Sequence, residues 1–348
     1  MDTGKTKSIE LWRLIFSFSI VLCHAATLSW NKRFHFSSLG VEFFFVLSGF
    51  LMAKSAHGKG DAKEKLGTET VSFLLRKLKV IYPTFLFAVL LEFAAQILLR
   101  TSNPGQPYVY LWDLLFLRIT GLGGVHLLAV GASWYLFAMF PAMWILYPLL
   151  RRFPDMFYNV IAPLTAVLIL GWFSITYGSI NHSMEFENGI SMGLLRAIAE
   201  LCAGCVSFYV CERVKLTGNK KINLFFWTFL EIVPLSGVFL ISAFRYRSQT
   251  DFICILLVGI GLCAAFSGKS YVSVILQRIN LKWASAFSLA LYLNHVVWLR
   301  TLNDWKMARP FEWQLSVLIG LSIITAITCI YSCNLARQIF YRIRKKQK

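Results

Sequence analysis

Apolar stretches as long as a bilayer-spanning helix recur along the whole 348-residue chain, and they restrict its fold more than any other feature. A helix that crosses the hydrocarbon core needs about 20 predominantly apolar residues. Hydrophobic residues make up 57% of the chain and charged residues 15%, which excludes an ordinary soluble domain. We therefore expect an all-α, polytopic membrane helix bundle that forms a single domain over 1–348. The expected spans lie near 9–30, 37–54, 77–99, 132–150, 157–179, 190–211, 223–243, 251–267, 283–302 and 312–337.

The basic residues predict how these spans are oriented. The net charge is +18, and most lysines and arginines gather in short connections between apolar runs, as expected of cytoplasmic loops. This distribution favours a membrane protein over a nucleic-acid-binding one. The stretch 108–131 is apolar but interrupted by Asp113, Arg118 and several glycines. If it crossed the membrane, the later basic loops would fall outside, so we expect a re-entrant or interfacial segment, ten transmembrane helices and both termini in the cytoplasm.

The first two apolar runs each contain one ionisable group at membrane depth, His24 and Glu42. A charged side chain there costs roughly 2.5–3.5 kcal/mol on insertion scales, so it needs a partner or a function. Arg13 precedes His24 by eleven positions, which places both on one helical face about 16 Å apart along the axis. Taken alone, Arg13 is best explained as a snorkelling arginine and His24 as a structural histidine. Together with Glu42 they favour a buried site.

The expected topology places three of these groups at one depth. His24 and Glu42 can meet in the outer half of the bilayer, where the carboxylate would fix the tautomer of the imidazole and raise its basicity. A structural clamp between two helices remains the alternative. His295 lies past the midpoint of another outward-running span, with Tyr292 one turn below it. The sequence thus predicts a shared polar site in the outer half of the membrane.

A second cluster of charge lies where the third span begins. Arg76 and Lys79 are three residues apart and share a helical face. Such residues are commonly anchors at the membrane surface. They could also bind a polyanionic cofactor, since phosphates pair well with arginine and lysine, and Arg13 could join them.

Two further polar groupings suggest structural roles. Arg196 and Glu200 are four residues apart on one helix, so we expect them to neutralise each other. Cys202 and Cys205 resemble half of a metal site, but they lie in an apolar run without a second half. We expect the cysteines to be packing residues and predict no metal.

Several short motifs occur in an order that resembles membrane acyltransferase family 3, whose members move acetyl or other acyl groups onto extracytoplasmic glycans. The resemblance covers most of the chain, and its specificity is concentrated in the first 85 residues. Glu42 stands where the family often has aspartate, and Lys79 stands where it has a second arginine. The motifs are Arg13-x10-His24, GVEFFFVLSGFLM at 40–52, Arg76-x-x-Lys79 with Tyr82-Pro83, Ser133-Trp134-Tyr135-Leu136 and Tyr292-Leu293-Asn294-His295.

The resemblance implies a multi-pass protein of the bacterial inner membrane and an acetyl-CoA donor that enters from the cytoplasm. Arg13, Arg76 and Lys79 would hold the nucleotide and pyrophosphate of this donor. The pantetheine arm would then follow the Arg13–His24 face, while a hydroxyl of an extracytoplasmic glycan or lipid-linked saccharide arrives from outside.

The resemblance also assigns roles at the site. His24, oriented by Glu42, would act as general base on the acceptor hydroxyl or carry the acyl group transiently. His295 would complete the catalytic set by positioning the acceptor or stabilising the oxyanion, and Tyr292 could share that role. The expected substrate contacts are Tyr292, Asn294, Trp134 and Tyr135.

A proton-coupled secondary transporter or glycan exporter is the alternative function. In that case His24, Glu42 and Glu231 would relay protons through the membrane. Transporters are commonly built from paired halves with discontinuous helices, and this sequence contains no internal repeat. The acyltransferase interpretation is therefore preferred.

Overall fold

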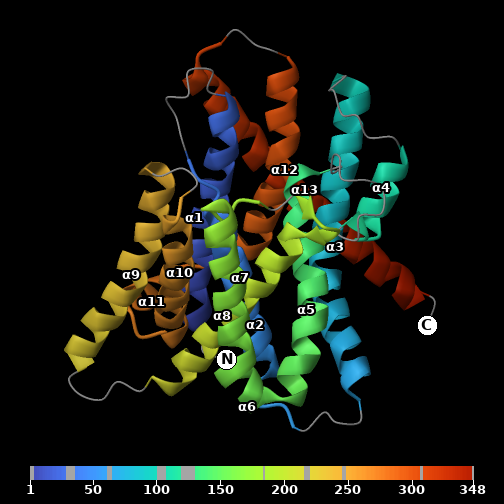
Figure 1. The fold of residues 1–348 in the computed structure, drawn as a ribbon. Helices are drawn as coiled ribbons and strands as arrows, with labels where there is room; N and C mark the ends of the chain where they lie inside the picture. Colours follow the sequence, from blue (N-terminus) through green and yellow to red (C-terminus); the bar gives the residue numbers. More distant parts are fainter. Residues whose placement is uncertain are drawn as a thin grey trace.

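The computed structural model describes residues 4–28, 36–60, 65–99, 107–118, 130–182, 185–214, 220–244, 248–305 and 309–346. In this part of the chain the fold is a helical bundle, with one antiparallel pair of two-residue strands, β1 (Phe186–Glu187) and β2 (Ile190–Ser191) (Figure 1). The helices are α1 (Gly4–Ala25), α2 (Gly40–Ala56), α3 (Leu66–Leu99), α4 (Pro107–Leu114), α5 (Trp134–Arg152), α6 (Pro154–Met156), α7 (Ala162–Tyr177), α8 (Met192–Arg213), α9 (Lys220–Phe244), α10 (Thr250–Ser267), α11 (Tyr271–Leu276), α12 (Ala284–Asp304) and α13 (Phe311–Lys346). Short turns of other helix types are η1 (Ala26–Leu28), η3 (Gly131–Ser133) and η4 (Phe157–Ile161).

The membrane character of the bundle is confirmed. Within the described residues, eight helical stretches are long and apolar enough to cross a membrane. The two other expected spans also fold as helices, α2 with 17 residues and α12 with 21. Ten crossings and cytoplasmic termini stay predictions. The eight stretches are Lys7–Leu28, Leu66–Leu99, Gly131–Arg152, Pro154–Tyr177, Met192–Arg213, Lys220–Phe244, Thr250–Ser267 and Phe311–Ile343.

The described part of 108–131 contains no helix long enough to cross a bilayer. Helix α4 has eight residues and packs against α3, where the rings of Phe93 and Tyr110 lie 5.8 Å apart. Near its end, the Tyr82 hydroxyl donates to the carbonyl of Leu114 at 3.4 Å. Positions 119–129 of the expected re-entrant segment lie outside the described residues.

Helix α2 lies in the interior of the bundle because its FFFVLSGF sequence is apolar on every side. It packs most extensively against α8. A Cβ atom on Gly49 would collide with the carbonyl of Leu201, and one on Gly204 would collide with the carbonyl of Val46. These two glycines therefore permit a backbone-to-backbone approach of the kind that small residues provide between membrane helices.

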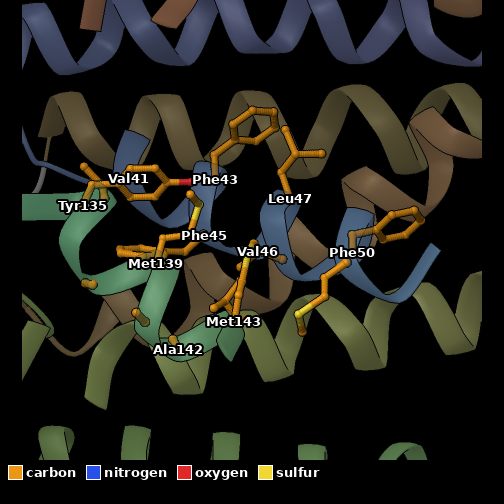
Figure 2. Close-up of a cluster of buried hydrophobic side chains, with 14 of the residues drawn as sticks. Val41, Phe43, Phe45, Val46, Leu47, Phe50, Tyr135, Met139, Ala142 and Met143 are labelled. Atoms are coloured by element: carbon orange, nitrogen blue, oxygen red, sulfur yellow. The ribbon is translucent and has the colours of Figure 1, made fainter. Parts of the chain in front are cut away.

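Helix α5 covers another side of α2. Figure 2 shows Tyr135, Met139 and Met143 beside the α2 side chains. The rings of Phe45 and Tyr135 lie 4.4 Å apart. The hydroxyls of Ser48 and Tyr135 are 2.8 Å apart, so a polar contact accompanies this apolar packing.

Helix α12 joins α1, α3 and α13. The Trp298 indole donates to the Thr325 hydroxyl of α13 at 3.2 Å, and Arg300 reaches Glu92 of α3 at 2.6 Å. This packing brings the two histidine-bearing helices, α1 and α12, together.

Candidate functional site

A cavity of about 590 Å³ opens among six helices of the described part of the chain, which come from its amino-terminal, middle and carboxy-terminal parts. Its walls come from α1, α2, α3, α5, α12 and α13, together with the turn before α12. Helix α2 contributes Phe44, Leu47, Ser48 and Leu51, which recur every three or four residues and so form one face. The motifs singled out in the sequence thus border one space.

One group of residues around the cavity is strongly cationic. Two of its cations, Arg13 and Arg76, were predicted to bind a polyanion, and both line the wall. No aspartate or glutamate lines it within the described part of the chain. Such a wall can hold phosphate groups through charge-assisted hydrogen bonds. The basic lining residues are Arg13, Arg76, Lys77, Lys282 and Arg337.

Lys79 is not part of the wall, in contrast to the prediction that it shares the binding face of Arg76. The lining residues of α3 occur at positions 73, 76, 77, 80, 81 and 84, which is one helical stripe. Lys79 falls outside this stripe, beyond the edge that Arg76 forms, and is exposed. Lys77 lines the wall instead, where Lys79 had been expected.

Three of the aromatic side chains that line the cavity, Phe44, Tyr135 and Tyr292, lie close to one another. The ring of Tyr292 lies 6.3 Å from that of Phe44 and 6.0 Å from that of Tyr135. The Tyr292 hydroxyl donates to the carbonyl of Ala132 at 2.6 Å, and the Tyr135 hydroxyl donates to the carbonyl of Phe44 at 3.1 Å. These hydrogen bonds hold both tyrosine rings at their tips, so this wall is preorganised.

The two predicted histidines come together behind Tyr292. The imidazole centroids of His24 and His295 are 5.1 Å apart, and the His295 ring is 6.3 Å from that of Tyr292. His295 is fully buried, with its Nδ1 3.2 Å from the carbonyl of Leu291. Its Nε2 has no hydrogen-bond partner among the described residues, whereas His24 is partly exposed. Neither imidazole lines the cavity itself.

Glu42 does not pair with His24 as predicted. Its carboxylate accepts from the Arg196 guanidinium at 2.7 Å, and both side chains are completely buried. Arg196 also donates to Glu200 at 2.7 Å, as expected, but it bridges two acids instead of neutralising one. The reason is the close crossing of α2 and α8, which gives the buried carboxylate a cation that a neutral imidazole could not match.

Two of the four predicted substrate contacts, Trp134 and Asn294, lie outside the cavity wall. Trp134 lies beneath the Arg196 guanidinium, 5.2 Å from it, and does not line the cavity. It therefore belongs to the Glu42–Arg196–Glu200 triad and not to the cavity wall. Asn294 is fully buried on α12 and also lies outside the wall, whereas Tyr135 and Tyr292 line it.

A family model described as an acyltransferase domain matches residues 6–333, nearly the whole chain. The chain belongs to the acyltransferase 3 family. No curated protein and no solved structure matches it. Membership shows that the protein is a transferase of acyl groups, and it confirms the family resemblance carried by the ordered motifs.

The proton relay required of a transporter is not continuous in this acyltransferase. The Glu231 carboxylate accepts from the Trp12 indole at 3.0 Å and from the Ser8 hydroxyl. Trp12 precedes His24 by twelve residues, or about 18 Å of helix. Glu42 is bound to Arg196. The three proposed relay groups therefore belong to separate clusters.

Sequence reasoning about this acyltransferase missed Lys77, Lys282, Arg337 and the second partner of Arg196. Helical periodicity could have identified Lys77, because Lys77 lies on the same stripe of α3 as Arg76 and Thr84. Lys282 and Arg337 lie in segments rich in basic residues, where nothing distinguishes a ligand from an anchor. No group of three or more His, Cys, Asp or Glu side chains that could hold a metal occurs in the described ranges.

Proposed function

We propose that this protein transfers an acetyl group from cytoplasmic acetyl-CoA to a hydroxyl of a cell-envelope or exported polysaccharide. The observation that carries the proposal is the cavity, which has a cationic wall and an aromatic wall that lies next to the histidine pair. Family membership supports acyl transfer. A location in the bacterial inner membrane, with the cationic wall toward the cytoplasm, follows from the same proposal.

The two kinds of wall suit the two ends of an acyl-CoA. Phosphates would contact Arg13, Arg76 and Lys77, where arginine and lysine offer charge-assisted hydrogen bonds. The pantetheine arm would pass the apolar side chains of α2, and the thioester would then lie beside Phe44 and Tyr292. This placement keeps the charged part of the donor at the protein surface and brings only its neutral part into the membrane.

The histidine pair supplies a base for the transfer. His24 would accept the proton of the acceptor hydroxyl, whose oxygen attacks the thioester carbonyl. The carbon–sulfur bond breaks, and the proton passes from His24 to the departing CoA thiolate. His295, whose Nε2 is without a protein partner among the described residues, would bind the acceptor hydroxyl or the developing oxyanion.

Glu42 would act as a positioning residue in this scheme. Its pair with Arg196 fixes α2 against α8, and α2 carries Phe44 and Ser48 of the cavity wall. The Ser48 hydroxyl in turn contacts that of Tyr135 at 2.8 Å. Loss of the pair would therefore disturb the aromatic wall without touching either histidine.

The test compares the glycan of cells that produce the wild-type protein with that of cells that produce His24→Ala. We expect NMR to show O-acetyl groups on the glycan only with the wild-type protein. We expect equal amounts of both proteins in the membrane fraction. His295→Gln should lower transfer about 10²–10⁴-fold, the range of acid–base contributions, and leave CoA binding unchanged. Full O-acetylation by the His24→Ala protein would refute the catalytic assignment.

A further inference from the structure

Lys282 and Arg337 line the same cavity as Arg13 but come from distant parts of the chain. Lys282 lies in the turn before α12, and Arg337 lies on α13. Both side chains are exposed, and neither has a carboxylate partner within the described residues. They are therefore hydrated cations that border a cavity and remain available to a ligand.

The arrangement differs from a row of anchors along one helix. Arg13 of α1 donates to the Ser285 hydroxyl, which places it beside the start of α12, three residues after Lys282. Arg337 shares its face of α13 with Cys333 and Asn334, which also line the cavity, and Arg76 enters from α3. The cations thus converge from four elements on one space, as a polyanion site requires.

The number of charges indicates how many phosphates the site accommodates. Five basic residues of the described part of the chain line the cavity, and one of them, Arg13, lies 3.3 Å from the Glu10 carboxylate, which offsets one charge. A diphosphate carries about two negative charges, and a terminal phosphomonoester adds about 1.5 to 2 at pH 7. A diphosphate alone would leave an excess of cations. A diphosphate with one additional phosphomonoester matches them.

We infer that Lys282 and Arg337 bind a terminal phosphomonoester of the acyl donor, separate from the diphosphate bound by Arg76 and Lys77. The inference rests on the proposed function, because it concerns the donor of that reaction. Acetyl-CoA, the donor of the proposed function, carries three phosphates, and the inference assigns the third of them to Lys282 and Arg337. The carboxy-terminal helix α13 then takes part in donor recognition.

The test measures binding of CoA and of 3′-dephospho-CoA to the purified full-length protein in lipid nanodiscs by calorimetry. CoA lacks an acyl group, so turnover does not interfere. We expect the wild-type protein to bind CoA about tenfold or more tightly than 3′-dephospho-CoA, as charge-assisted contacts to one phosphate would give. Lys282→Ala and Arg337→Ala should lose most of this preference and bind 3′-dephospho-CoA as the wild type does. Lys282→Arg should retain it.

Arg342→Ala is the matched control, because Arg342 is an exposed cation of α13 outside the cavity wall. Its preference for CoA should equal that of the wild type. Equal binding of the two ligands by the wild type, or equal weakening of both by Lys282→Ala and Arg337→Ala, would overturn the inference and leave the proposed function standing. Failure of the wild type to bind either ligand would overturn both.

Discussion

The carboxylate of Glu42 and the guanidinium of Arg196 lie 2.7 Å apart, although 154 positions separate them in the chain. Both side chains are fully buried, and Arg196 holds Glu200 at the same distance on its other side. This triad ties α2, which lines the cavity, to α8, which does not. We therefore expect it to support the cavity wall that is proposed to bind the donor, at a distance from the reacting groups.

Replacement of Arg196 by methionine should destabilise the protein strongly. The change leaves two carboxylates buried without a cation, and breaking a buried ion pair in this way typically costs about 3–5 kcal/mol. We expect a clear fall in the melting temperature measured in detergent micelles. Arg213→Met, at the exposed end of the same helix, should change it little. An unchanged melting temperature of the Arg196→Met protein would contradict the assigned support role.

The close crossing of α2 and α8 leads to a second prediction, which concerns the stability of a Gly49 variant. A methyl group at Gly49 would overlap the backbone carbonyl of Leu201, which cannot rotate away. Gly49→Ala should therefore reduce stability by an amount at the upper end of the roughly 1–3 kcal/mol that overpacking costs. The matched control is Gly237→Ala in α9, where nothing lies within 4 Å of the added carbon.

Thermal unfolding of both alanine variants, followed by fluorescence-detected size exclusion, measures this difference. The Gly237→Ala protein should be as stable as the wild type or slightly more so, because alanine favours helix over glycine. Equal stability of the two variants would show that α2 and α8 have room to separate.

The sequence predicted the helices and the histidine pair because each depends on position along a helix axis. Run length alone predicted the eight helical stretches of the described residues that are long and apolar enough to cross a membrane, and depth alone brings His24 and His295 to one level. The partner of Glu42 depends on how α2 is rotated and on which helix crosses it. Its apolar sequence is uniform around the helix, so no pattern reveals that rotation.

The cationic wall likewise contains some residues that the sequence could identify and others that only the fold reveals. Arg13 and Arg76 could be chosen from their spacing to other motifs, whereas Lys282 and Arg337 required the fold. Only the packing of α12 and α13 against α1 and α3 places them at the cavity. Sequence reasoning therefore identified two of the five basic residues that line the cavity in the described part of the chain, and its third candidate, Lys79, is not among them.

Neighbouring lysines on α3 offer a direct test of that face. Lys77 lines the cavity, whereas Lys79 lies outside the lining stripe and is exposed. Lys77→Ala should weaken CoA binding about tenfold, the effect of losing one charge-assisted contact. Lys79→Ala should leave the calorimetric dissociation constant within about twofold of the wild type. A weaker CoA affinity of the Lys79→Ala protein alone would show that the donor binds elsewhere.

The aromatic wall predicts which acyl groups are transferred. Phe44, Tyr135 and Tyr292 surround the place proposed for the thioester, and hydrogen bonds at the tips of both tyrosines hold the wall in place. With the thioester in this proposed position, the added carbons of an acyl chain longer than acetyl would meet these rings. We therefore expect kcat/KM for butyryl-CoA to fall well below that for acetyl-CoA, since one methylene changes such ratios by about 10–200-fold.

Phe44→Ala should raise the butyryl-to-acetyl ratio of kcat/KM by at least tenfold, because it opens space next to Tyr292 without removing either histidine. Leu51→Ala is the control. Leu51 lies on the same cavity face of α2, two turns away, so its loss enlarges the cavity where the pantetheine arm would pass. An equal rise of the ratio in both variants would mean that cavity volume as a whole, and not the aromatic wall, sets acyl length. A ratio unchanged by Phe44→Ala would place the thioester away from this ring.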